Sequence, residues 1–332
     1  MLLVGCTKSI EQQVVEQLEL GKKYLEEENY EEAIVAFNKV IDLEPKEIQA
    51  YISLANVYIQ KDDRIQAEEI MSHGFVVLEA MTVEEKGERK EDIDKLYFIS
   101  IENYKELAKA YVDLKEYEQA MDILKRGIDI TTDKTLEDYG NQLMREEIKK
   151  RVSEINIPFT VDQIELNVSD ISEAKEAYMG QQYVYSNLMM TNGSGTYDSD
   201  TVYLCYGMNG TPIPEGYEKD TFGFIFCAPV SGGPVNDISI CEQNMLCFGA
   251  IRIGMSTSEV MDIMGLYGLE KFLVDDVEWM TDSNIELKIE DNIYKDGTVR
   301  YACGNSIGIL TFRKGKLWCV SMRNRERFAE ID

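Results

Sequence analysis

Apolar residues recur at helical spacing through the first half of the chain, and the arrangement of several of them repeats. One set recurs 34 residues on, as the pairs Leu20 and Leu54, Tyr24 and Tyr58, and Ala33 and Ala67. A larger set recurs 53 residues on, as Tyr51 and Tyr104, Leu54 and Leu107, Ala55 and Ala108, Tyr58 and Tyr111, Ala67 and Ala120, and Gly74 and Gly127. A shared offset predicts copies of one helical unit, stacked side by side.

The repeated unit resembles the tetratricopeptide repeat (TPR), a helix–turn–helix of 34 residues. The first copy carries most residues of that family's pattern, namely Leu20, Gly21, Tyr24, Ala33, Phe37 and Pro45, with Gln17 in place of Trp. The resemblance implies that the small residues Gly21 and Ala33 lie where two helices cross closely. It also implies that Pro45 ends the second helix.

The repeats define an N-terminal helical domain over residues 10–155. We expect repeats at about 14–47, 48–81 and 101–134, which leaves 82–100 as an insertion whose last part extends the first helix of repeat three backwards. Residues 136–155 predict one more helix, with apolar and basic residues on opposite sides. The end of a solenoid needs a cap with one polar face, and this helix suits that role. The fold class expected here is a TPR α-solenoid.

The pattern changes after Pro158, and residues 156–332 form a second expected domain. Short runs with strand-like alternation occur at 183–190, 201–207, 222–228, 285–290, 298–303, 307–313 and 316–322. Ile285, Leu287 and Ile289 alternate with charged residues, which is typical of a strand with one buried face. Lys314-Gly315 predicts a tight hairpin turn. Because the connections are short, the sequence predicts an antiparallel-sheet α+β domain.

Two helical stretches interrupt the predicted strands and look related. Residues 164–180 and 251–265 each have an apolar start, a Ser-rich cap and a closing Gly. In the second, Ser256 and Glu259 predict a capping box, and Gly265 predicts the end of the helix. This stretch resembles small envelope lipoproteins and beta-lactamase-inhibitory-protein-like modules, which implies a helical layer on a four-stranded antiparallel sheet. We therefore expect a duplication, with halves at about 160–248 and 249–332.

Residues 1–9 suggest a lipid anchor and a spacer. Leu3-Val4-Gly5-Cys6 resembles the lipobox of a bacterial lipoprotein signal peptide. The charged and longer apolar regions of such a peptide are missing. The resemblance implies lipidation of Cys6 and an extracytoplasmic protein tethered to the membrane of the cell envelope. If the match is accidental, a cytoplasmic scaffold follows instead.

The formal net charge of −27 argues against nucleic acid as a partner, because the phosphate backbone is repelled. In the TPR family, the first helices of successive repeats line a groove that takes a protein or peptide. The groove positions carried over to this chain include Lys22, Gln49, Ile52, Asn56, Lys105 and Lys109. The alternative is that these are ordinary solvated helix positions.

Candidate catalytic chemistry is sparse. The chain has one histidine, His73, which lies in a repeat, so the second domain has neither the general base nor the zinc ligand that histidine provides. The six cysteines after Cys6 form no Cys-x-x-Cys pair, and both buried thiols and disulfides remain open. We expect no catalytic residue, no metal site and no cofactor.

The sequence thus predicts a non-enzymatic cell-surface lipoprotein that acts as a protein-binding adaptor or scaffold through its TPR groove. Two alternatives assign the function to the second domain. It would be an inhibitor with an exposed aromatic patch on its sheet. Or it would be a glycan-binding or hydrolytic module using acids and aromatic residues, among them Tyr183, Tyr185, Tyr203 and Trp279. In either case the TPR would be a spacer.

Overall fold

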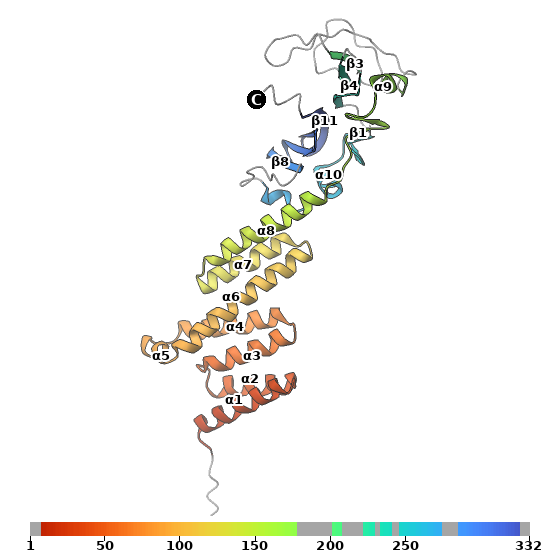
Figure 1. Ribbon diagram of the computed structural model, residues 1–332. Coiled ribbons are helices and arrows are strands. Elements are labelled where there is room, and N and C mark those ends of the chain that lie inside the picture. The colour runs from red at the N-terminus through yellow and green to blue at the C-terminus, as the bar shows by residue number, and fades with distance from the viewer. Residues whose placement is uncertain are drawn as a thin grey trace, which may run out of the picture. The chain divides into compact units, whose positions relative to one another are not determined.

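The computed structural model describes residues 8–177, 201–207, 222–229, 233–240, 246–273 and 285–325. It forms two compact units, Met1–Arg145 and Glu146–Asp332. The first is helical and the second is built on antiparallel sheets, which confirms the predicted fold class (Figure 1). The units divide inside a helix, ten residues before the boundary expected at residue 155. Within the described residues, no helix combines the length and the apolar character needed to cross a bilayer.

Helices pair in the first unit as the repeats predict. Their bounds are α1 (Ile10–Glu26), α2 (Tyr30–Leu43), α3 (Ile48–Gln60), α4 (Arg64–Glu79), α5 (Val83–Glu88), α6 (Lys90–Asp113), α7 (Tyr117–Thr131) and α8 (Thr135–Glu154). The hairpins α1–α2, α3–α4 and α6–α7 are the three repeats, and α8 occupies the expected place of the capping helix.

The turn inside each hairpin has the same backbone conformation in all three repeats. Its central residue is left-handed each time, at Glu28 (φ 59°), Asp62 (φ 60°) and Lys115 (φ 63°). In each repeat the amide of the next residue donates a hydrogen bond to the carbonyl of the tyrosine at the equivalent position. The pairs are Asn29–Tyr24, Asp63–Tyr58 and Glu116–Tyr111, each at 2.8 Å. The offsets of 34 and 53 residues therefore relate equivalent structures as well as similar sequences.

The close helix crossing expected in the first repeat is present. Ala33 and Phe37 are fully buried, and a Cβ added at Gly21 would lie 2.6 Å from the Phe37 ring. Real Cβ atoms do not approach a ring so closely, so α1 and α2 can pack at this distance only if residue 21 is glycine.

The insertion forms α5 and the first turns of α6, and ion pairs attach it to the turn between α2 and α3. Lys46 pairs with Glu85 at 2.7 Å, and Arg89 pairs with Glu47 at 3.0 Å. The hydrogen bond from Lys46 lowers the pKa of Glu85 to about 2. Gly87 lies in α5, because a capping box of Thr82 and Glu85 starts a helix there.

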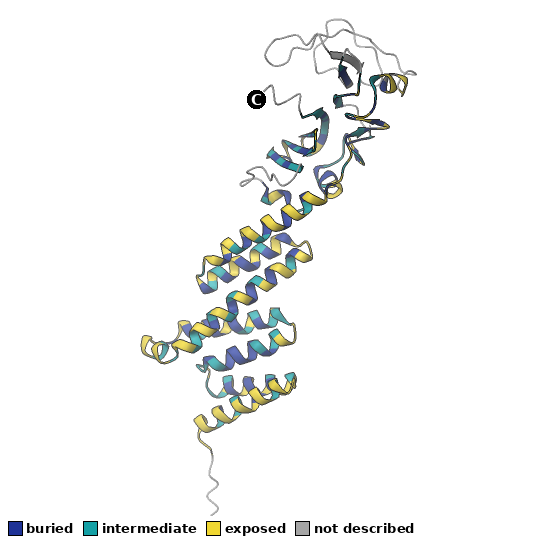
Figure 2. Ribbon diagram, viewed as in Figure 1, coloured by how far each residue is buried: buried dark blue, intermediate teal, exposed yellow. Residues whose placement is uncertain are grey.

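The central helix of the first unit, α3, is enclosed by its neighbours. Only Gln60 among its residues is exposed, and Figure 2 shows the helix almost entirely in the colours of buried and intermediate residues. It contacts α2, α4 and α6. Its first turns pack in a core cluster with Met71 and Phe75 of α4 and Leu96 of α6.

The second unit contains two antiparallel sheets. A four-stranded sheet has the order β2-β1-β6-β7, and a seven-stranded sheet the order β3-β4-β5-β11-β10-β9-β8. The strands are β1 (Thr160–Val161), β2 (Ile164–Glu165), β3 (Thr201–Gly207), β4 (Phe222–Pro229), β5 (Asp237–Ile240), β6 (Leu246–Cys247), β7 (Ile251–Arg252), β8 (Ile285–Asn292), β9 (Asp296–Cys303), β10 (Ser306–Arg313) and β11 (Lys316–Asn324). Six of the seven predicted strands are confirmed, and the one at 183–190 lies outside the described residues.

Local turn chemistry in this unit also follows the prediction. Lys314 (φ 52°) and Gly315 (φ 69°) are both left-handed between β10 and β11, as a tight hairpin turn requires. The capping box of Ser256 and Glu259 starts α10 (Thr257–Ile263), and Gly265 (φ 71°) follows its end. The other helix, α9, spans Ile171–Ala177.

An aromatic cluster joins the two sheets. Phe159 stacks on Tyr301 with ring centroids 5.5 Å apart, and Phe248 meets both rings edge-on. A Cβ at Gly308 would lie 2.2 Å from the Phe248 ring, so β10 approaches this ring closely. The Tyr301 hydroxyl donates to the carbonyl of Ile155 at 3.0 Å, which gives its buried oxygen a partner.

The second unit has an internal two-fold relation in the four-stranded sheet. The Asp162 amide donates to the Leu246 carbonyl at 3.3 Å, and the Phe248 amide donates to the Thr160 carbonyl at 2.7 Å. Phe248 lies 86 residues after Asp162, and Leu246 lies 86 residues after Thr160, so the two hydrogen bonds join equivalent positions in opposite directions. Asp162 (φ 49°) and Phe248 (φ 51°) share the left-handed conformation.

The helices that follow obey the same relation. The Asp170 amide donates to the Glu173 carboxylate at 2.9 Å, and the Ser256 amide donates to that of Glu259 at 2.8 Å, again 86 residues apart. In the larger sheet, β3–β5 and β8–β11 meet through β5 and β11. These equivalences relate β1, β2 and α9 to β6, β7 and α10. The expected duplication stays a prediction, and its boundary at residues 248 and 249 falls inside the hairpin of β6 and β7.

Candidate functional site: the groove face of the helical unit

The predicted groove positions lie on α1, α3 and α6, the first helix of each repeat. Lys22 of α1 and Lys109 of α6 occupy the same place in their repeats, and both are exposed. Within the part of the chain that the structure describes, neither ammonium forms an ion pair or a hydrogen bond. Asn56 occupies that place in the middle repeat and is half-buried. The positions thus offer two cations flanking an amide.

Lys105, the other cation expected in the groove, is engaged within the protein. Its ammonium pairs with Glu102 at 2.9 Å and lies 5.8 Å from the centre of the Tyr139 ring. The Tyr139 hydroxyl donates to the Lys105 carbonyl at 3.4 Å. Because its charge is already compensated, Lys105 contributes less than Lys22 and Lys109 to attraction of an anionic partner.

The remaining groove positions lie on α3 and are less accessible. The side-chain amide of Gln49 donates to the Ser53 hydroxyl at 3.2 Å. Ile52 is 4% exposed and belongs to the core cluster with Met71 and Leu96. The enclosure of α3 between neighbouring helices explains both observations. The accessible part of the face is therefore supplied mainly by α1 and α6.

Phe98 is an exposed residue of α6 that the repeat pattern did not point to. Its side chain is 66% exposed, and it precedes Lys105 by seven residues. Two turns of an α-helix bring residues at this spacing to the same side, so Phe98 extends the groove face of α6. It lies in the insertion, outside the 34-residue repeat, and only its place on an amphipathic helix could have indicated it.

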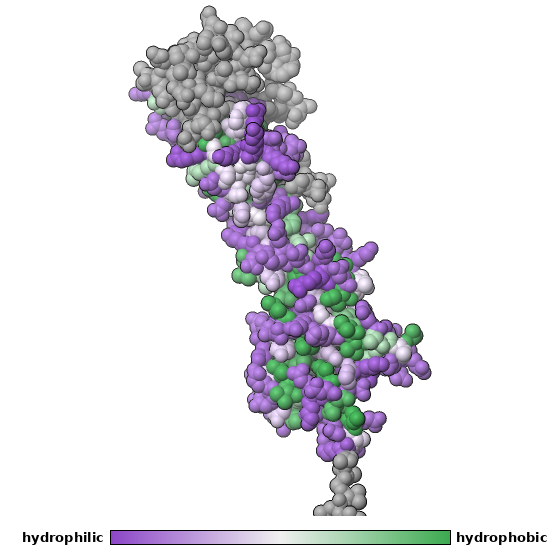
Figure 3. Space-filling model, turned by 180° about the vertical axis from the view of Figure 1, so that it is seen from behind, coloured by the Kyte–Doolittle hydropathy of each residue, from purple (hydrophilic) through white to green (hydrophobic). Residues whose placement is uncertain are grey.

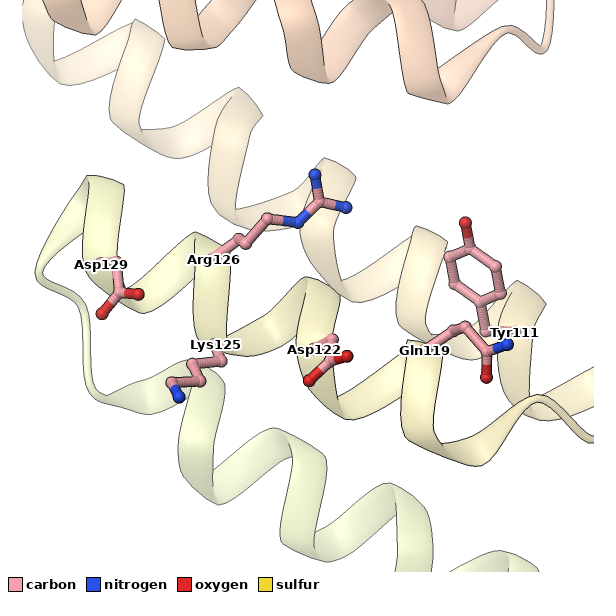
Figure 4. Close-up of a pocket in the computed structure, with 6 residues that line it drawn as sticks. All are labelled: Tyr111, Gln119, Asp122, Lys125, Arg126 and Asp129. Carbon is pink, nitrogen blue, oxygen red and sulfur yellow. The ribbon is translucent and has the colours of Figure 1, made fainter. Parts of the chain in front are cut away.

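A shallow pocket of about 500 Å³ lies elsewhere on the third repeat. Figure 4 shows that Tyr111 comes from α6 and the other five residues from α7. The lining is Tyr111, Gln119, Asp122, Lys125, Arg126 and Asp129. All five α7 side chains are exposed, and the charges balance. Exposed charges act in a high dielectric and bind weakly, so the pocket is a poor catalytic site.

Exposed apolar side chains also occur on the second helices of the repeats. Val35 of α2 and Ile65 and Val76 of α4 are each at least 60% exposed. Seen from behind, hydrophobic residues lie over the helical unit among hydrophilic ones (Figure 3). Single exposed apolar side chains are common on protein surfaces, so these positions alone define no binding site.

The carboxylate of Glu270 is a buried titratable side chain of the second unit. Glu270 is 2% exposed, and its Oε1 accepts a hydrogen bond from the Tyr294 hydroxyl. Burial, and to a smaller extent the hydrogen bond to Glu270, raises the pKa of Tyr294. Within the described ranges, no group of three or more His, Cys, Asp or Glu residues could hold a metal ion.

The cysteines and aromatic residues singled out from the sequence are only partly described. Cys227 lies in β4 and Cys319 in β11, Cys247 and Cys303 are free thiols, and burial raises the pKa of Cys247 to about 12. Tyr183, Tyr185, Trp279 and the lipobox Cys6 lie outside the described residues, and of Tyr203 the structure describes the backbone. Trp318 is half-buried, with the Arg313 guanidinium 3.5 Å from its ring centre.

Comparisons with known proteins identify the repeats. The pattern of the family described as TPR repeat matches residues 21–62, and that of the tetratricopeptide repeat matches residues 101–134. The chain therefore contains tetratricopeptide repeats. The second match has the bounds expected for repeat three, and residues 82–100 lie between the two matches. No curated protein matches the chain.

Solved structures are similar to this chain only at low identity and with low TM-scores. The N-terminal domain of stress-induced protein-1 (STI-1) from C. elegans is 18% identical, with a TM-score of 0.30, and 41% of this chain and 98% of that one are covered. The MamA protein is 15% identical, with a TM-score of 0.22, and 43% of this chain and 94% of that one are covered. The Hsp90 co-chaperone Cns1 from Saccharomyces cerevisiae is 13% identical, with a TM-score of 0.25 and coverage of 94% and 73%.

Proposed function

We propose that this protein is a non-catalytic adaptor that holds a protein or peptide partner against the groove face of its helical unit. The observation that carries the proposal is the pair Lys22 and Lys109. They occupy equivalent places on the first helices of matched repeats, and both ammonium groups are exposed and unpaired among the described residues.

The charge of the chain indicates the chemistry of the partner. The protein has a formal net charge of −27, so most of its surface repels an acidic molecule. Free cations on the groove face make this face the favourable one for acidic side chains or a carboxylate. Complementary charges fix the orientation of a partner more than they increase its affinity. We therefore propose an acidic segment of another protein as the occupant.

The proposal predicts loss of partner binding in the full-length double variant Lys22→Glu, Lys109→Glu. Each change replaces an attraction by a repulsion, so partner capture from the native cell envelope should fall by about tenfold or more. Quantitative affinity capture with mass spectrometry of the retained proteins measures this. The matched control is Lys39→Glu, Lys125→Glu, which makes the same charge change on the exposed second helices. Equal loss in both variants, or no loss in either, contradicts a site on the groove face.

We also propose that Cys6 is lipidated and holds the adaptor on the outer side of a cell membrane. The four lipobox positions at residues 3–6 and the polar residues that follow support this placement. A single chain gives only weak membrane attachment, so stable tethering needs more than one acyl chain. In this arrangement the second unit is a further protein-contact module of the same chain.

A further inference from the structure

Phe98 is the starting observation, because it is exposed where its neighbours are packed. Within the described residues of the helical unit, it is the only exposed phenylalanine, tyrosine or tryptophan. The opposite side of the same helical segment is buried, with Leu96 and Ser100 fully inaccessible. Next to Phe98, the Tyr97 ring meets Phe75 edge-on at 4.8 Å. The side of α6 opposite Phe98 therefore packs against the other helices, and the Phe98 ring is exposed to solvent.

The insertion makes this ring part of the groove face. Repeat three begins at residue 101, whereas α6 begins at Lys90, so the insertion lengthens the helix towards its N-terminus. Phe98 precedes Lys109 by eleven residues, about three helical turns, and both side chains point to the same side. The rise of about 1.5 Å per residue places them about 16 Å apart along the helix.

Of the α6 lysines Lys95, Lys105 and Lys109, two are paired with glutamates and one is not, within the described part of the chain. Glu91 pairs with Lys95 at 3.0 Å, and Glu102 pairs with Lys105 at 2.9 Å. Lys109 has no such partner within the described residues. The extended face of α6 thus offers an apolar contact at one end and an unpaired positive charge at the other.

The insertion is also held in place before any partner binds. Its helix α5 is tied to the turn between α2 and α3 by the pairs Lys46–Glu85 and Arg89–Glu47. In the second pair the Glu47 side chain is 17% exposed. A surface that is already ordered loses little conformational freedom on binding, which favours affinity.

We propose that the insertion at residues 82–100 adds an apolar anchoring site at Phe98 to the groove face. This inference rests on the adaptor function proposed above. Its occupant is an extended acidic segment of a partner protein that carries a bulky apolar residue. An extended chain advances about 3.3 Å per residue, so about five residues separate the apolar side chain from the acidic one that meets Lys109.

The test uses random peptides displayed on phage, selected on the immobilised full-length protein. Selected peptides should share a bulky apolar residue about five positions from an acidic residue. A synthetic peptide of the selected sequence should bind the Phe98→Ser variant about tenfold more weakly, as expected for loss of an apolar anchor. Phe98→Leu should retain most of the affinity. Val35→Ser, which removes a comparably exposed apolar side chain from α2, should bind as the natural chain does.

The outcomes separate this inference from the function on which it rests. If acidic peptides are selected and depend on Lys22 and Lys109 but bind Phe98→Ser unchanged, the anchoring site is wrong and the adaptor function stands. If no peptide is enriched on the natural chain, both are wrong. Each variant should unfold at the temperature of the natural chain, because Phe98 is exposed and its replacement removes no core contact. Thermal unfolding followed by circular dichroism checks this.

Discussion

The Gly127→Val variant is expected to lose about 3 kcal/mol of unfolding free energy, because overpacked cores do not relax freely. Gly127 lies in α7, where a Cβ would stand 2.8 Å from Leu136 of α8 and 2.8 Å from the Tyr104 ring of α6. Both neighbours are at most 1% exposed. Adding a branched side chain forces three helices apart at the end of the solenoid. Urea unfolding followed by far-ultraviolet circular dichroism measures the loss.

The matched control for this variant is Gly87→Val. Gly87 also lies in a helix, α5, but a Cβ there meets no atom within 4 Å. Both changes alter helix propensity in the same way, by a few tenths of a kcal/mol. The difference between the two variants therefore reports the crowding at Gly127 alone. Equal stability of the two variants contradicts the close packing of α6, α7 and α8.

The Cys6→Ser variant, expressed in the native cell, is expected to move from the membrane fraction to the soluble fraction almost completely. Only a thiol can carry the acyl anchor that the lipobox resemblance implies, and serine at position 6 removes it. Fractionation and immunoblotting measure the distribution. Mass spectrometry of the natural protein should find the modification on Cys6.

Two findings bear against the anchor. An unmodified Cys6 in the natural protein excludes lipidation directly. A Cys6→Ser variant that stays in the membrane fraction indicates attachment through another part of the chain or through a partner. The variant Cys303→Ser, which also removes one free thiol, is a control for effects of cysteine loss as such.

Elements governed by local sequence could be predicted with their positions. The helices of the repeats follow from spacing of apolar residues, and the start of α10 follows from Ser256 and Glu259. The left-handed conformation of Glu28 and Lys115 could not be predicted, because glutamate and lysine ordinarily avoid positive φ, whereas Asp62 is of a type that tolerates it. The repeat packing on both sides of the turn imposes this conformation.

Features that depend on distant parts of the chain were less accessible from sequence. Six strands of the larger sheet were predicted, but β5 was not. It pairs with β11 across about 80 residues, and no local signal encodes that pairing. In the groove, position alone could not show that Tyr139 and Glu102 engage Lys105. Nor could it show that α3 is enclosed and Ile52 is buried. Exposure of Phe98 required knowing which side of α6 packs.

The measurement that most directly tests the central claim is site-specific photo-crosslinking of the full-length protein in its native cells. A photoreactive amino acid placed at Lys109, and separately at Lys22, should capture the same partner protein. The same probe at Lys39 or Lys125, which are exposed on second helices, should capture that partner weakly or not at all. Capture confined to the groove face is the result that the adaptor account predicts. Equal capture from all four positions, or none from Lys22 and Lys109, contradicts it.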